Sequence, residues 1–174
     1  MKSNYKQRLQ RKDDQKNLRR YSIVYCSQLY KIAPKYFKNK KKIERLQRAI
    51  LVEFDRILVQ ETYNNEGKVE DTVWAFENLV NRYELPIDYA PIRERMLRKK
   101  TEKRYMYEAM LIFLTICYHN TVGDYIKRES TQKAILQELI KAYIAECKSG
   151  LMKVYNNRDL FAERICNATG YVPD

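Results

Sequence analysis

The strongest constraint on the fold is an apolar stretch at residues 105–118, in which Glu108 is the only charged residue. Its apolar residues fall on every side of a helix, so a helix here must be enclosed by other segments rather than packed on one face. At about 1.5 Å per residue it spans about 20 Å, and it is shorter than the ~20 apolar residues that cross a bilayer. The stretch therefore predicts a buried central helix and no transmembrane segment.

The rest of the chain has the pattern of amphipathic helices. Apolar residues recur at helical spacing in residues 18–32, 43–58, 69–83, 135–143 and 160–166. The chain has four Gly and four Pro in 174 residues, which leaves little room for the many tight turns of an all-β fold. We therefore predict an all-α protein, a single-domain bundle of six or seven helices around the buried central helix near residues 105–118. The helical domain is expected over residues 13–174, after a basic, mobile N-terminal arm at residues 1–12.

Proline and capping residues predict where helices begin. The stretch 85–91 holds two prolines, so we expect an extended connector there, with Pro91 in the first turn of a helix that begins at Ile92. Ser130 or Thr131 is the expected N-cap of a later helix, because a short hydroxyl side chain can accept a hydrogen bond from the free N–H groups of the first turn.

The cysteines predict a reducing compartment. They lie far apart, with no C-x-x-C pair, and each sits in an apolar stretch; they are Cys26, Cys117, Cys147 and Cys166. This distribution favours buried, reduced thiols over a disulfide framework. The N-terminus has positive charges but no apolar run behind them, so we expect neither a secretory signal nor a membrane anchor. These features together predict a cytoplasmic protein.

The charge of the chain is strongly uneven. The net charge is +12, and the sequence pI is about 9.5. Residues 1–20 hold eight Lys or Arg, residues 31–48 hold eight, and residues 93–104 hold seven. Residues 53–88 instead hold nine Asp or Glu and only three basic residues. Such a surplus of positive charge suggests an anionic partner, either nucleic acid or a membrane surface, and does not by itself choose between them.

Two of the basic blocks coincide with the predicted starts of helices. Cations there oppose the helix dipole and give up a few tenths of a kcal/mol each, which an external anion would compensate. We therefore predict a basic, helical accessory protein that binds the phosphate backbone of nucleic acid, DNA or RNA, with weak sequence specificity. The predicted contact residues are Lys38, Lys40, Lys41, Lys42, Arg93, Arg95, Arg98, Lys99, Lys100, Lys103 and Arg104.

An alternative function is protein interaction or assembly. An acidic face formed by residues 53–88 would then meet the basic face of a partner protein or of a second copy, with no nucleic acid involved. Basic runs are also common as solvated faces, and the acidic stretch can equally lie against the basic blocks inside the fold. Tyr21, Tyr25, Tyr30 and Tyr36 interleave with basic residues, where they would either stack on bases or pack at the edge of the core.

No catalytic motif is found in the sequence. Glu108 and His119 share one stripe of the central helix, but they are eleven positions apart, about 16 Å along the axis, too far to hold one metal ion or pass one proton. We expect His119 to cap its helix or bond to another helix, and Glu108 either to pair with an Arg or Lys or to border solvent. Gly67-Lys68 lacks the flanking residues of a phosphate loop. We therefore predict no enzymatic activity, no cofactor and no metal site.

Overall fold

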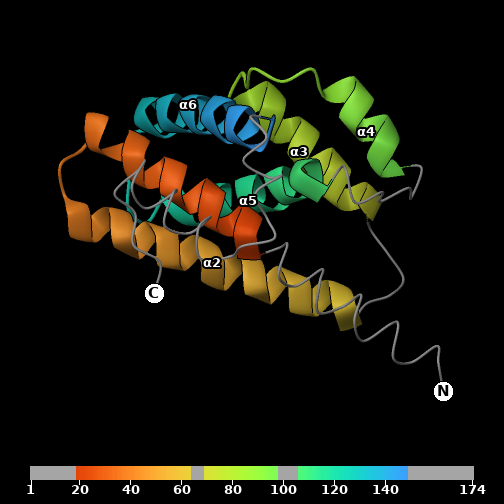
Figure 1. Ribbon diagram of the computed structural model, residues 1–174, viewed down its shortest axis with the longest axis horizontal. Helices are drawn as coiled ribbons and strands as arrows, with labels where there is room; N and C mark the ends of the chain where they lie inside the picture. The colour runs from red at the N-terminus through yellow and green to blue at the C-terminus, as the bar shows by residue number, and fades with distance from the viewer. Residues whose placement is uncertain (1–18, 64–68, 98–105, 149–174) are drawn as a thin grey trace.

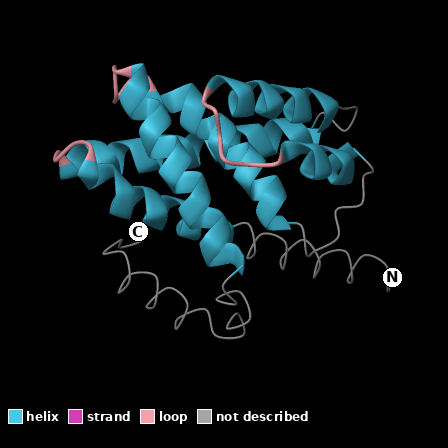
Figure 2. Ribbon diagram, turned by 90° about the horizontal axis from the view of Figure 1, so that it is seen from above, coloured by secondary structure: helices cyan, strands magenta, loops and turns pink. Residues whose placement is uncertain are grey.

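The predicted all-α fold is confirmed. The computed structural model describes residues 19–63, 69–97 and 106–148, and within these ranges all regular elements are helices (Figure 2). The predicted arm at residues 1–12 and the last apolar pattern at residues 160–166 lie outside them. The elements, in chain order, are a helix at residues 19–32, the 3-10 helix η1 (Ala33–Lys35), α2 (Lys40–Tyr63), α3 (Val69–Arg82), α4 (Tyr89–Leu97), α5 (Met106–Val122) and α6 (Glu129–Lys148).

Helix α5 is the buried centre of the bundle, as predicted. It packs against α2, α3 and α6, which surround it (Figure 1). Met110, Leu111, Leu114 and Tyr118 each expose 1 % of their surface or less. Burial of this apolar area drives the packing of the other helices, at about 25 cal/mol per Å². None of the described helices combines the length and the apolarity that crossing a bilayer needs.

The helix at residues 19–32 lies across α2 and α5 and pairs its buried polar groups with both. The hydroxyl groups of Tyr25 and Thr115 lie 3.4 Å apart, and Gln47 donates a 2.6 Å hydrogen bond to the carbonyl of Cys26. The ring of Tyr25 meets that of Tyr143 on α6 edge to face, with centroids 5.6 Å apart. The hydrogen bonds satisfy groups that would otherwise be costly to bury.

Helix α4 begins earlier than expected. It starts at Tyr89 rather than Ile92, and Pro91 is its third residue. A proline is tolerated there because the N–H groups of the first turn have no partner within the helix. Tertiary contacts set the start: the Tyr89 hydroxyl donates to the carbonyl of Val73 at 2.6 Å, and its ring packs edge to face on Phe76.

The start of α6 also differs from the prediction. The helix begins at Glu129, so neither Ser130 nor Thr131 is its N-cap. The N–H groups of Thr131 and Gln132 instead donate to the backbone carbonyl of Arg128, both at 3.1 Å. The hydroxyl-bearing residues therefore lie inside the first turn of the helix rather than before it.

The described cysteines agree with the prediction of reduced thiols. Cys26 and Cys117 are buried, Cys147 is partly buried, and all are free; Cys166 lies outside the described residues. Burial raises the pKa of Cys26 and of Cys117 to about 12. Both thiols are therefore protonated at neutral pH and serve as small apolar packing groups.

Candidate nucleic-acid interface

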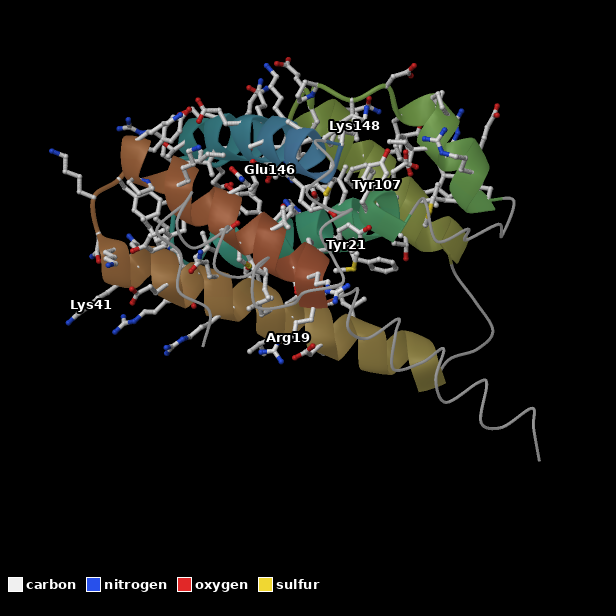
Figure 3. The ribbon with its side chains drawn as sticks, in the orientation of Figure 1. Arg19, Tyr21, Lys41, Tyr107, Glu146 and Lys148 are labelled. Atoms are coloured by element: carbon white, nitrogen blue, oxygen red, sulfur yellow. The ribbon has the colours of Figure 1, made fainter. Side chains whose placement is uncertain are left out.

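The first predicted basic block forms one exposed end of the molecule. Lys40, Lys41 and Lys42 are the first residues of α2, and Lys38 lies in the connection before it; all are exposed. We call these four side chains the lysine tip. In Figure 3 Lys41 projects at the left edge of the molecule, where α2 begins. A surface of this kind is available to a large external partner.

The backbone at this end follows from the sequence. Asn39 precedes the helix, and its side-chain oxygen accepts the N–H of Lys42 at 3.1 Å, which caps the first turn. On the inner side of the same turn, Ile43 and Leu46 are buried and hold α2 against the core. Because the inner positions are apolar, the lysines of this turn point outward.

The positive charge of the lysine tip is not neutralised within the described residues. The first turn of α2 contains no acidic residue. The side chains of Lys38, Lys41 and Lys42 make neither a hydrogen bond nor an ion pair in the described part of the chain. Lys40 lies over the ring of Tyr30, 5.6 Å from its centroid, and a hydrogen bond with Tyr30 raises its pKa. The tip therefore places cations at a helix start where they destabilise the fold slightly.

The second predicted block differs from the lysine tip, because its described arginines form ion pairs within the fold. Arg93 donates to Glu77 on α3 at 2.8 Å, and its guanidinium lies 5.9 Å from the ring centroid of Trp74. Arg95 makes a two-pronged ion pair with Glu108 on α5, at 2.6 and 3.0 Å. Both arginines thus hold α4 to the bundle. The other predicted contact residues of this block lie outside the described residues: Arg98, Lys99, Lys100, Lys103 and Arg104.

The two blocks do not come together in the described structure. The lysine tip lies at the end where α2 begins, whereas α4 lies at the opposite end of the long axis (Figure 1). A surface that joined Lys41 with Arg93 or Arg95 would have to reach along the whole molecule. Among the described residues, the candidate interface is therefore the lysine tip.

Several carboxylates of the acidic stretch are paired within the fold. Glu53 accepts from Arg56 and from Asn120, and the resulting hydrogen bonds lower its pKa. Glu77 pairs with Arg93, and Glu84 pairs with Lys133 on α6. These contacts leave less negative charge available for an external basic partner than the sequence alone indicates.

The interleaved tyrosines divide into two groups. Tyr21 and Tyr25 are in the core, and Tyr30 is half-buried. Tyr36 instead exposes 39 % of its surface, in the connection that leads to Lys38. The ring of Tyr36 is thus accessible for stacking on a base, whereas the rings of Tyr21 and Tyr25 are buried and cannot stack on one.

Sequence reasoning did not single out every cation near the tip. Lys31, at the end of the first helix, and Arg45, one turn into α2, are both exposed and belong to the same end of the fold. Both residues belong to the basic block at residues 31–48, so the charge of the whole block indicates them, whereas its run of consecutive lysines does not. Nearby, Lys35 pairs with Glu138 on α6 at 3.4 Å.

The expected roles of the two titratable residues of the central helix are confirmed. Glu108 pairs with Arg95, and Nδ1 of His119 bonds to the hydroxyl of Tyr83 on α3 at 2.8 Å. Burial, with a smaller effect of Arg82, lowers the pKa of His119. A search of the described ranges finds no cluster of His, Cys, Asp or Glu arranged to hold a metal ion. The contacts of both residues are those of helix packing.

Comparisons with other proteins give no relative from which a function can be transferred. No family model matches the chain, and no curated protein or solved structure matches it. Function must therefore be argued from the chemistry of the lysine tip and its surroundings.

Proposed function

We propose that the protein binds the phosphate backbone of nucleic acid through the lysine tip. The single observation that carries this proposal is the contrast between the two basic blocks. The described arginines of α4 are paired with Glu77 and Glu108, whereas the ammonium groups of Lys38, Lys41 and Lys42 have no partner in the described part of the chain. Clustered cations at a helix start are unfavourable in the free protein, and phosphates would compensate for them.

The binding is electrostatic and weakly sequence-specific. Lysine is a flexible point charge, and it does not offer the planar two-pronged geometry with which arginine selects guanine edges. Contacts of this kind fix a protein on the backbone and carry no sequence information directly. The lysine tip thus serves an accessory role, in which the protein attaches to nucleic acid irrespective of sequence.

Salt dependence tests this proposal on the full chain. Four phosphate contacts give a slope of log K against log salt of about −3 on single strands and about −4 on duplex. The variant Lys41→Gln/Lys42→Gln should flatten the slope by about 1.4 to 1.8 units, because two counterion-releasing contacts are lost. Its thermal unfolding should be unchanged or slightly improved, since two cations leave the positive end of the helix dipole. Fluorescence anisotropy with labelled oligonucleotides measures the affinities.

The matched control is Lys141→Gln/Lys148→Gln. Both lysines are exposed on α6, and their side chains too make no hydrogen bond or ion pair within the described residues. This variant loses the same net charge, so it reports the effect of charge alone. If both double variants weaken binding equally, or if the wild-type protein binds neither DNA nor RNA at about 50 mM salt, the proposal is wrong.

A further inference from the structure

An exposed aromatic ring lies next to the lysine tip. Tyr36 follows η1, where its N–H bonds to the carbonyl of Ala33 at 3.0 Å, and 39 % of its surface is exposed. The next residue, Phe37, donates its N–H to the same carbonyl and packs its ring against the core. The connection is therefore anchored by Phe37 and η1, while the ring of Tyr36 is left facing solvent beside Lys38.

The phenol of Tyr36 is uncharged. Desolvation, together with the carboxylate of Glu138, which pairs with Lys35, raises the pKa of Tyr36 above its usual value. A phenol is already neutral at physiological pH, and the shift acts in the same direction. The exposed ring therefore presents no negative charge to phosphates.

We infer that the ligand of the lysine tip is single-stranded nucleic acid, with Tyr36 as a platform on which one base stacks. The inference rests on the proposed function and goes further by naming the strand state. In a duplex the faces of the bases are covered by their neighbours, whereas an unpaired base can turn onto an aromatic side chain. Lysines around an aromatic platform are the combination that single-strand-binding surfaces use.

The place of the tip in the fold favours the same ligand. The connection between the first helix and α2 lies at the outer edge of the molecule, where α2 begins (Figure 1). A flexible single strand can bend around such an edge and bring successive phosphates to several lysines.

The substitution Tyr36→Leu tests the inference. Base stacking on an aromatic ring contributes about 1–3 kcal/mol, so the full-chain variant should bind single-stranded oligothymidylate or oligouridylate of about 15 nucleotides at least fivefold more weakly. Its affinity for duplex of the same length should stay within about twofold of wild type, since only phosphates are contacted there. Tyr36→Phe keeps the ring and should bind single strands as wild type does. Fluorescence anisotropy at one salt concentration gives all of these affinities.

The control is Trp74→Leu, which removes another exposed aromatic ring, on α3 and away from the tip. It should leave both affinities unchanged. If Tyr36→Leu binds single strands like wild type, or loses as much affinity for duplex, the stacking inference is wrong while phosphate binding through the lysines still stands. If the wild-type chain binds neither form, this inference and the proposed function are both overturned.

Discussion

Glu84 ends α3 in an unusual backbone conformation for a residue with a side chain. Its φ is +49°, in the left-handed region that glycine normally occupies. The N–H of Leu85 reaches back to the carbonyl of Val80 at 3.0 Å, which closes the end of the helix. The carboxylate pairs with Lys133, and Gln137 donates to the carbonyl of Glu84. Contacts with α6 thus hold Glu84 in a conformation that it would otherwise avoid.

This backbone strain predicts different stabilities for two small replacements of Glu84. Glu84→Ala keeps the left-handed conformation and loses the ion pair, whereas Glu84→Gly loses the same pair but relieves the strain. We therefore expect Glu84→Gly to be more stable than Glu84→Ala by about 1 kcal/mol in urea unfolding. Equal stabilities, or a more stable alanine variant, would show that the backbone at this position is not strained.

Helix α4 is joined to the bundle largely through charged and aromatic contacts. It is short, and Tyr89, Ile92 and Met96 are its buried residues. On its other side, Arg93 bonds to Glu77 of α3 and Arg95 to Glu108 of α5. The side chain of Glu108 is 7 % exposed, so its charge depends on Arg95 for compensation. The position of α4 is therefore set by ion pairs as well as by apolar burial.

Removal of the buried partner tests this role. Glu108→Ala removes the carboxylate that accepts two hydrogen bonds from Arg95 at a partly buried site, and we expect a loss of about 2 kcal/mol in the free energy of unfolding. Glu138→Ala is the control, since the pair of Glu138 with Lys35 is exposed and should contribute less than about 0.5 kcal/mol. Chemical denaturation measures both. Similar losses in the two variants would contradict a special role for Glu108.

The whole molecule has an excess of positive charge that is concentrated rather than spread. Glu53, Glu77 and Glu84 form ion pairs with arginine or lysine side chains of the chain itself. The ammonium groups of Lys38, Lys41 and Lys42 form none within the described residues. Like charges at the exposed tip repel a second copy of the chain. This arrangement supports binding to an anionic polymer more than it supports assembly through an acidic face.

The oligomeric state therefore distinguishes the two functions. With a net charge of +12, and with Glu53, Glu77 and Glu84 already paired, the protein should sediment as a monomer even at low salt, where the Debye length is about 30 Å. Analytical ultracentrifugation over a salt series checks this. Oligomers that form at low salt and dissociate as the Debye length falls to about 8 Å would instead favour the assembly alternative, with acidic and basic faces meeting between copies.

The all-α fold class and the buried central helix follow from the spacing of apolar residues in the sequence. The apolar residues at 105–118 have no polar side, so enclosure was the single stable outcome, and the helical spacing of Ile43, Leu46 and Ile50 fixed which face of α2 is buried. The separation of Glu108 and His119 along one helix was likewise enough to exclude a shared metal ion, because helical rise is fixed by local geometry.

Which charged side chains remain free to bind an external partner depends on the tertiary structure. A sequence shows which residues are basic, but their ion pairs depend on which helices pack together. The packing of α4 against α3 and α5 places Arg93 against Glu77 and Arg95 against Glu108. The same cause moved the start of α4 to Tyr89, whose hydroxyl finds the carbonyl of Val73 on a neighbouring helix. Hydrogen bonds and ion pairs between distant residues leave no periodic pattern in the sequence, whereas burial does.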